Sequence, residues 1–459
     1  MKKIFYFTLF SMALMGLSSC SLKEDDNFDE NAAQRAEERI KEVKDMLYTA
    51  PNGWLMEYYG NLNFGGYNVM VKFNGNEATI GSEKWGTNHV AGVDTEGNAI
   101  TTTSHFKLEQ SMGVIISFDG FNETFHYYSM PNNPDYRYDT ADGLRGDFEF
   151  RVMSASPDSI ILRGKKHNNR IRMTPIPADK TWASIINEAK ETENFMTSRS
   201  YTLSGADRKD TVEISVTNNG NYRCLIFEYT DSTMLKQTVA APYIVKADGY
   251  YFYTPVEVNG MQLDGIVKGD TDDHFIFRNN SNLQLDPVLY TLADNFRHYS
   301  WYMHYDDLGD YGRHNWDNML AILETAGPNE DKVKIYTVTI GLTSDGKLAV
   351  SMTTSDGNPY NLFSIRRVSD DGTEMTLRRN NLASGTNADG KEYLNNRGWK
   401  ACLSQFFGAN DGGLAFKMEC DNERNPSYII LRDTRNQNNV IKLYSAPSYF
   451  MNDAGYYND

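Results

Sequence analysis

The densest group of reactive side chains in this chain begins at His304 and ends at His314. Between these two imidazoles stand three carboxylic acids, Asp306, Asp307 and Asp310. Carboxylate oxygens are ligands for Ca²⁺ and imidazole nitrogens for softer metals, but the spacing does not follow the ligand order of a Ca²⁺-binding loop. We therefore expect no metal site, with His304, Asp310 and His314 as weak candidates. We interpret the segment as a loop that caps the helix after it.

Aromatic residues around these acids offer a second chemistry, the binding of sugar rings. Trp and Tyr side chains lie against the apolar faces of a sugar while neighbouring polar groups bond its hydroxyls. Aromatic residues at alternate positions of a strand are also commonly divided between core and surface, which is the competing interpretation. The candidate ligand-binding residues are Trp301, Tyr302, Tyr305, Asp306, Asp307 and Trp316.

The sequence motifs of common enzymes are absent from the chain. It contains no nucleophile elbow, Gly-rich phosphate loop, dinucleotide fingerprint or HExxH metal helix. We therefore expect no catalytic residue and no cofactor. The alternative is a hydrolase, a glycosidase or peptidase, whose acids meet only in the fold and come from Asp306, Asp307 and Asp310.

The N-terminus has the pattern of a bacterial lipoprotein signal. Lys2 and Lys3 precede an apolar run (4–17) that is too short to span a bilayer and ends in small residues before Cys20. We expect residues 1–19 to be removed as a signal peptide. The thiol of Cys20 and its new amine would then be acylated.

Residues 20–30 are polar and acidic and have no apolar pattern, which predicts a solvated tether. The tether also resembles the export signal of Bacteroidota lipoproteins, in which a lysine and then acidic residues follow the lipidated cysteine. The matching residues are Lys23, Glu24, Asp25 and Asp26. This resemblance implies an outer-membrane protein that is held by its lipid and faces the cell exterior.

Composition limits the classes of partner. The formal net charge of −16 repels phosphate backbones, so we expect no nucleic acid. No later segment approaches the about 20 consecutive apolar residues of a membrane span, so the lipid is the expected anchor. Besides Cys20 there are three cysteines. Cys402 and Cys420 could form a disulfide, or all three, Cys224 included, could be buried thiols, since spacing does not decide connectivity.

The chain contains three copies of one module. Apolar residues at i, i+3, i+4 and i+7 predict amphipathic helices that begin at Trp182 and Trp316, and a longer helix lies within 31–49. Each helix is followed by alternating β-branched residues that run into Asn-Gly or Asp-Gly, the signature of a hairpin. A closing hairpin also repeats. The first hairpins are expected at 69–76, 212–221 and 338–347, and the closing hairpins at 160–173, 275–285 and 429–443.

These repeats predict an α+β, β-rich fold of three modules, each a short amphipathic helix packed on an antiparallel sheet of hairpins. Prolines after the closing strands, at Pro177 and Pro287, disfavour continuing the ladder and suggest boundaries. The expected order is a signal peptide (1–19), a lipidated tether (20–30), module 1 (31–178), module 2 (179–287) and module 3 (288–459), with a helical insertion near 391–407.

Three further segments carry a resemblance to a known family: Ala-Pro-Asn-Gly-Trp at 50–54, Arg-Gly-Asp-Phe-Glu-Phe at 145–150 and Ile-Leu-Arg-Gly-Lys-Lys at 161–166. With the lipoprotein signal and the length, they resemble the Bacteroides lipoprotein family catalogued as domain of unknown function number 4302. Members are commonly encoded beside outer-membrane nutrient importers of the starch-utilisation type and their partner lipoproteins. The resemblance implies a surface role in nutrient capture.

We therefore predict a lipid-anchored, non-catalytic binding or accessory component of a nutrient uptake system. Its partners would be the importer, partner lipoproteins and a glycan or peptide ligand. The alternatives are the hydrolase named above and a structural, adhesin-like interaction protein. A hydrolase requires clustered carboxylates with perturbed pKa in a cleft, whereas a binding protein requires an exposed platform without them.

Overall fold

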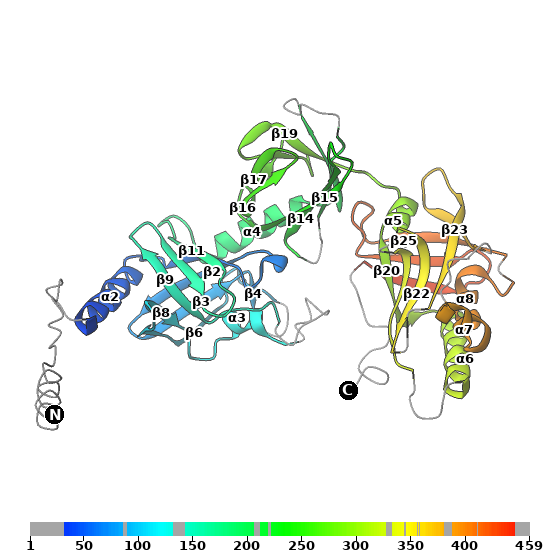
Figure 1. Cartoon of the computed structure of the whole chain (residues 1–459), viewed down its shortest axis with the longest axis horizontal. Helices are drawn as coiled ribbons and strands as arrows, with labels where there is room; N and C mark the ends of the chain where they lie inside the picture. Colours follow the sequence, from blue (N-terminus) through cyan, green and yellow to red (C-terminus); the bar gives the residue numbers. More distant parts are fainter. Residues whose placement is uncertain are drawn as a thin grey trace, which may run out of the picture.

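The computed structural model describes residues 32–85, 90–131, 143–205, 212–218, 222–326, 333–343, 346–355, 357, 359–380, 388–410 and 412–445. Outside these residues lie Cys20 and the predicted export residues Lys23, Glu24, Asp25 and Asp26. Three large antiparallel sheets follow one another along the chain (Figure 1). The prediction of a β-rich α+β fold with three repeated modules is confirmed. Each helix in the described ranges is too short or too polar to cross a membrane.

The first module is helix α2 (Ala32–Leu47) followed by a nine-stranded sheet. The strands lie in the order β6 (Thr101–His105), β3 (Glu77–Ser82), β2 (Tyr67–Asn74), β1 (Trp54–Tyr58), β11 (Arg170–Pro175), β10 (Ile160–Gly164), β9 (Glu149–Ala155), β8 (Val114–Ser117) and β7 (Lys107–Gln110). The first and last strands, β1 and β11, pair with each other. The edge strands β6 and β7 are separated in sequence only by Phe106, so the sheet forms a nearly closed barrel.

Smaller elements complete this module: β4 (Lys84–Trp85) paired with β5 (Val90–Ala91), helix α3 (Glu123–His126), and the 3₁₀ turns η2 (Leu62–Phe64) and η3 (Tyr127–Ser129). Asn122 begins α3 because its side chain accepts a hydrogen bond from the Phe125 amide at 3.0 Å. Tyr127 and Tyr128 of η3 are buried in the core of the module.

The second module is helix α4 (Trp182–Phe195) followed by a closed barrel of eight strands. Thr181 and Ser184 form a capping box that begins α4. The strands are β12 (Ser200–Gly205), β13 (Ser215–Asn218), β14 (Cys224–Thr230), β15 (Lys236–Val245), β16 (Gly249–Val258), β17 (Met261–Lys268), β18 (Phe275–Phe277) and β19 (Asn280–Pro287). Each strand pairs with the next, and β19 pairs with β12 to close the barrel.

The third module is a second closed barrel of eight strands, preceded by helix α5 (Leu292–His298). Its strands are β20 (Ser300–Leu308), β21 (Ile335–Leu342), β22 (Leu348–Thr354), β23 (Tyr360–Val368), β24 (Glu374–Arg379), β25 (Leu414–Cys420), β26 (Tyr428–Asp433) and β27 (Val440–Tyr444). Helix α6 (Asp310–Ala326) lies between β20 and β21. The segment expected to hold a helical insertion forms two helices, α7 (Ala388–Asn396) and α8 (Trp399–Phe407).

The repetition extends to the register of the first strands. Trp54 in β1, Tyr201 in β12 and Trp301 in β20 are fully buried aromatic residues at equivalent places. Each lies opposite a β-branched residue of the next strand, and the first two also lie opposite the proline that ends the last strand of their module. The pairs are Trp54 with Val71 and Pro175, Tyr201 with Val216 and Pro287, and Trp301 with Ile340.

The matching of the two predicted helices at Trp182 and Trp316 needs correction. Helix α4, which contains Trp182, precedes the first strand of its barrel, whereas α6, which contains Trp316, follows the first strand of its barrel. The counterpart of α4 is therefore α5. An apolar stripe is what any helix on a core requires, so equal spacing does not establish an equivalent position in the fold.

The antiparallel sheets of hairpins expected for modules 2 and 3 close into barrels, and their interiors are filled by side chains. Eight strands enclose a space just wide enough for side chains, and closure removes the unpaired edges. The core of the second barrel includes Tyr201, Phe227, Tyr250 and Phe275, and that of the third includes Trp301, Trp316, Trp399 and Phe406. The three described cysteines Cys224, Cys402 and Cys420 are free, so Cys402 and Cys420 form no disulfide.

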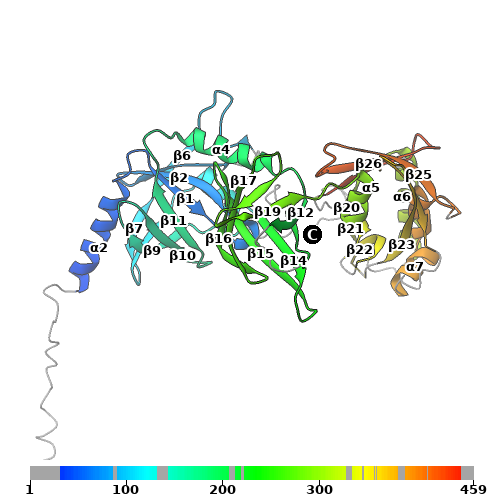
Figure 2. The ribbon, with the colours of Figure 1, turned by 90° about the horizontal axis from the view of Figure 1, so that it is seen from above.

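Modules 1 and 2 pack against each other (Figure 2). Module 3 touches module 2 through Tyr299, whose ring lies 3.7 Å from the Arg199 guanidinium and whose hydroxyl is hydrogen-bonded to Ser200. Helix α4 contacts β2 of module 1 and β15 of module 2. The Nδ2 of Asn68 donates to the main-chain oxygen of Val245 at 2.7 Å. The Nζ of Lys246 lies 2.5 Å from the Glu57 carboxylate. Helix α4 and these two polar contacts therefore join module 1 to module 2.

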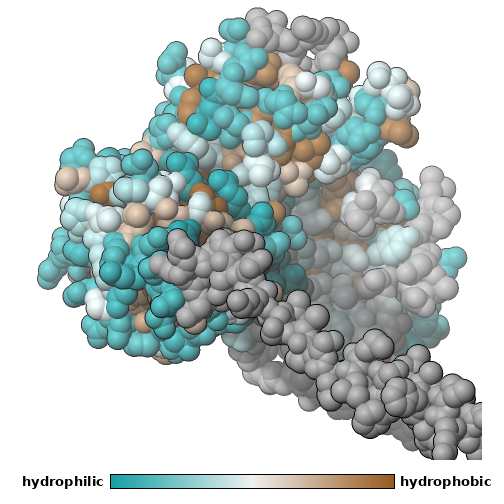
Figure 3. Space-filling model, turned by 60° about the vertical axis from the view of Figure 1, so that its left-hand side comes forward, coloured by the Kyte–Doolittle hydropathy of each residue, from teal (hydrophilic) through white to brown (hydrophobic). Residues whose placement is uncertain are grey.

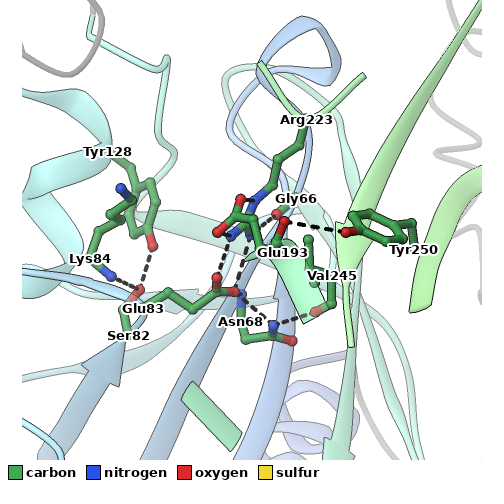
Figure 4. A network of polar contacts seen from close by, with 10 residues as sticks. All are labelled: Gly66, Asn68, Ser82, Glu83, Lys84, Tyr128, Glu193, Arg223, Val245 and Tyr250. Atoms are coloured by element: carbon green, nitrogen blue, oxygen red, sulfur yellow. Dashed lines mark hydrogen bonds and ion pairs between the residues drawn. The ribbon is translucent and has the colours of Figure 1, made fainter. Parts of the chain in front are cut away.

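Arg223 lies at the centre of this interface (Figure 4). Its guanidinium donates to Glu83 of module 1 from Nη1 at 3.2 Å and to Glu193 of α4 from Nε at 2.9 Å, and also to the Gly66 oxygen at 2.8 Å. Burial opposes the charge of this group, but the two carboxylates hold the pKa of Arg223 above its usual range. One cation thus joins two acids from different modules.

Candidate functional site

The two tryptophans predicted to bind ligand lie in the core of the third module. Trp301 and Trp316 are both fully buried. Trp301 occupies an inward-facing position of β20, and its Nε1 donates to the main-chain oxygen of Phe296 at 3.3 Å. The expectation that these residues form a surface platform is therefore wrong. Alternation in the strand places Trp301 inside, as the competing interpretation of the aromatic pattern held.

The two predicted tyrosines, Tyr302 and Tyr305, are half-buried. Burial and a hydrogen bond to Asp317 raise the pKa of Tyr305 to about 12, and the hydroxyl donates to the Asp317 Oδ1 at 2.8 Å. Burial also raises the pKa of Tyr302. Without the two tryptophans, these rings form only a small part of the predicted platform.

The predicted acids and imidazoles lie on β20 and on the first turns of α6, where a loop was expected. Asp307 accepts a hydrogen bond from the Tyr444 hydroxyl at 2.9 Å and lies 3.7 Å from His304. Asp310 pairs with Arg313 at 2.9 Å.

The remaining two groups, Asp306 and His314, lie in different surroundings. Asp306 is exposed, and the Nε2 of His314 lies 3.0 Å from the Nδ2 of Asn318. Within the described ranges, no three side chains of His, Cys, Asp or Glu are placed to hold a metal ion. The segment from His304 to His314 is therefore a strand and a helix start whose polar groups have separate partners.

A hollow of about 580 Å³ lies on the first module. It is formed where η3, the start of β9 and the turn between β10 and β11 meet. Two of the segments that carry the family resemblance, 145–150 and 161–166, both contribute to it. The lining residues are Ser129, Gly146, Asp147, Phe148, Glu149, Lys165 and Lys166.

Asp147 fixes the shape of this hollow. Its carboxylate accepts hydrogen bonds from the amides of Lys166 at 3.2 Å and His167 at 3.0 Å. Its main-chain oxygen accepts from the buried Tyr58 hydroxyl at 3.2 Å. A Cβ on Gly164 would lie 1.9 Å from the Asp147 Oδ2, so this close approach requires glycine. The buried carboxylate of Asp147 thus holds the turn between β10 and β11.

The walls of the hollow offer charge and a flat ring. Lys165 Nζ donates to both oxygens of the Glu149 carboxylate at 2.9 Å, and both side chains are partly exposed. The Phe148 ring stacks on His126 with centroids 4.3 Å apart and an interplanar angle of 17°. Ser129 Oγ donates to the His126 oxygen at 3.1 Å. A cation, an anion and a ring therefore lie at one opening, which suits a polar ligand of small size.

A family model described as "Domain of unknown function (DUF4302)" matches residues 24–269. The chain belongs to this family. The match confirms the resemblance predicted from the three segments. It spans the whole nine-stranded sheet, with the hollow, and the second module as far as β17. The hollow is thus part of the DUF4302 region.

No curated protein matches the chain. A DNA polymerase sliding clamp from Bacillus subtilis is 10% identical over 91% of this chain and 98% of its own, with a TM-score of 0.11. The transferrin binding protein B of serogroup B Neisseria meningitidis is 9% identical over 82% of this chain and 64% of its own, with a TM-score of 0.13. Neither likeness is close enough to indicate a shared fold or function.

Proposed function

We propose that this DUF4302 protein is a lipid-anchored, non-catalytic binding component of an outer-membrane nutrient uptake system. The lipoprotein signal before Cys20 and the acidic residues after Lys23 support an anchor at the outer membrane that faces the cell exterior. The importer and its partner lipoproteins are the proposed protein partners. The ligand is a glycan or a peptide.

The observation that carries this proposal is the convergence of segments 145–150 and 161–166 at one hollow. Its volume of about 580 Å³ lies within the range of about 300–1,000 Å³ common for small-ligand pockets. Glu149 and Lys165 supply an acceptor and a donor for hydroxyl, ammonium or carboxylate groups of a ligand. The Phe148 ring supplies a flat apolar surface for a sugar face or a side chain.

Binding at the outer surface also fits the packing of the modules. The interiors of the two closed barrels are filled by their own side chains, so a ligand has its place outside them. The face shown in Figure 3 is largely hydrophilic, with apolar residues scattered over it. Such a surface suits a body held in water at the end of a tether.

The test is a screen of the protein beginning at residue 21 against panels of glycans and peptides, for binding and for cleavage. For any ligand found, the pair Glu149→Ala and Lys165→Ala should weaken binding at least about tenfold, which corresponds to about 1.4 kcal/mol. The matched control is Glu419→Ala with Arg432→Ala. That pair is also an ion pair between neighbouring segments of a sheet, and its exposures of 45% and 46% resemble the 40% and 46% of Glu149 and Lys165.

Each outcome separates one hypothesis from the others. Release of a cleaved product would overturn the non-catalytic proposal in favour of a hydrolase. Absence of binding to every ligand would favour a structural, adhesin-like protein. Equal binding by both variant pairs would place the ligand elsewhere than in the hollow.

The proposed location has its own test. Protease added to whole cells should degrade the protein, and protection of the protein would contradict exposure at the cell surface. Cys20→Ala should release the protein from the membrane fraction. Continued membrane association of that variant would contradict the lipid anchor.

A further inference from the structure

Asp273 is a buried carboxylate at the turn that leads into β18 of the second barrel. It is fully buried, and its φ of 64° is in the left-handed region. Its Oδ1 accepts hydrogen bonds from the Thr197 amide at 2.9 Å and from the Tyr201 hydroxyl. The carboxylate therefore connects the turn before β18 to the chain between α4 and β12.

Three buried side-chain oxygens at this place have no hydrogen-bond partner: the Oδ2 of Asp273, the Oγ1 of Thr197 and the Oγ of Ser198. They belong to residues that are joined to one another, because the Ser198 amide donates to the Tyr201 hydroxyl at 3.1 Å and that hydroxyl donates to Asp273. Buried polar atoms are normally paired, so three unpaired oxygens in one cluster indicate a missing partner.

The charge at this cluster is also unbalanced. In the part of the chain that the structure describes, no Lys, Arg or His nitrogen forms an ion pair with Asp273. A buried carboxylate without a cation costs several kcal/mol. Helix α4 ends at Phe195, whose ring lies 5.4 Å from that of Phe275, so the negative end of the helix dipole is nearby as well. The unpaired Asp273 carboxylate and the dipole of α4 both favour a positive charge at this cluster.

We propose that Asp273, Thr197 and Ser198 bind a monovalent cation of the Na⁺ type. Carboxylate and hydroxyl oxygens are the ligands that hard cations take in proteins. The cluster has one carboxylate, which balances one positive charge. The described chain has no group of three acidic, imidazole or thiol side chains that would hold a divalent metal. The bound ion fastens the end of α4 to the turn before β18.

Hydrogen exchange of the peptide that contains the Thr197 amide is the test, because this amide donates to Asp273. The protein beginning at residue 21 is compared in NaCl and in tetramethylammonium chloride at equal ionic strength. Na⁺ at ten times its Kd should slow exchange through local opening about elevenfold, whereas the bulky cation should not. Asp273→Asn should abolish this difference, and Asp272→Asn, at the exposed neighbouring position, should retain it.

Ser198→Ala provides a milder variant if Asp273→Asn does not fold, and it should reduce the Na⁺ effect. Equal exchange in the two salts would overturn the proposal and assign the space to water. Protection that appears at low pH without Na⁺ would overturn it in favour of a protonated carboxyl. A Na⁺ effect of the same size in Asp273→Asn would place the ion at another site.

Discussion

The Nε1 of Trp54 donates a hydrogen bond to the main-chain oxygen of Leu47 at 2.8 Å, so the first strand of module 1 holds the last residue of the helix before it. Trp301 bonds in the same way to Phe296 of α5. In the second module, the equivalent residue Tyr201 donates to Asp273 instead. An inward aromatic residue thus connects the first strand of each module to a neighbouring segment.

Trp54→Phe tests this connection. The change leaves the Leu47 oxygen unpaired in the core and removes ring volume, so we expect a loss of about 2–4 kcal/mol in the free energy of unfolding. Urea denaturation measures it. Trp182→Phe is the control, since Trp182 also donates to a main-chain oxygen at 2.8 Å but is half-buried, and its loss should be smaller. Equal losses of unfolding free energy in Trp54→Phe and Trp182→Phe would show that burial does not increase the cost.

Arg223→Met should strongly lower the free energy of unfolding of the first and second modules, which Arg223 joins. It leaves the buried Glu83 carboxylate without its cation, which costs about 3–5 kcal/mol. Replacing both residues with Met should recover part of that loss, because no buried charge then remains. Arg432→Met, in an exposed ion pair with Glu419, should cost less than about 1 kcal/mol. A double variant as unstable as the single one would show that shape, not charge, decides the cost.

Gly164→Ala should distort the hollow. The added Cβ would lie 1.9 Å from the Asp147 carboxylate, so the turn between β10 and β11 must shift, at a cost of about 1–3 kcal/mol. Thermal unfolding and the affinity for any ligand of the hollow measure the effect. Gly412→Ala meets nothing within 4 Å and serves as the control. An unchanged melting temperature in Gly164→Ala would contradict the close approach.

Buried tyrosines predict a loss of stability in alkali. Burial raises the pKa of Tyr58, Tyr128, Tyr201 and Tyr250 above the ordinary value of 10.0. The unfolded chain therefore loses these protons first, so stability is complete below about pH 10 and falls as the pH rises above it. Absorbance at 295 nm should show fewer tyrosines ionised at pH 11 in the folded protein than in guanidinium. Equal ionisation in both would contradict the burial.

The hairpins were predictable because their signals are local. Alternating residues that end at Asn74-Gly75 form β2 and β3, and the segment 160–173 forms β10 and β11. Closure of the barrels was not predictable, because pairs such as Tyr201 with Pro287 join distant residues whose own neighbourhoods carry no sign of each other. Helix α5 is not predictable from the sequence, because its seven residues are too few for an apolar stripe to be distinct.

The sites were harder to predict than the strands. Alternation in β20 predicts that one set of aromatic residues faces inward, but it does not show which set, so it does not place Trp301 in the core. Segments 145–150 and 161–166 carry the family resemblance, yet the hollow depends on amides that bond to Asp147 only after folding. Arg223 and Glu83 stand 140 positions apart, so neither residue alone signals the ion pair.

The pairing of β19 with β12 decides where a shorter version of this protein can end. The family match stops at residue 269, before β18 and β19. A fragment cut there would leave β12 and β17 with bare hydrogen-bonding edges, which recruit strands from other chains and cause aggregation. A soluble two-module fragment for crystallisation should therefore extend through Pro287, where the closing strand ends.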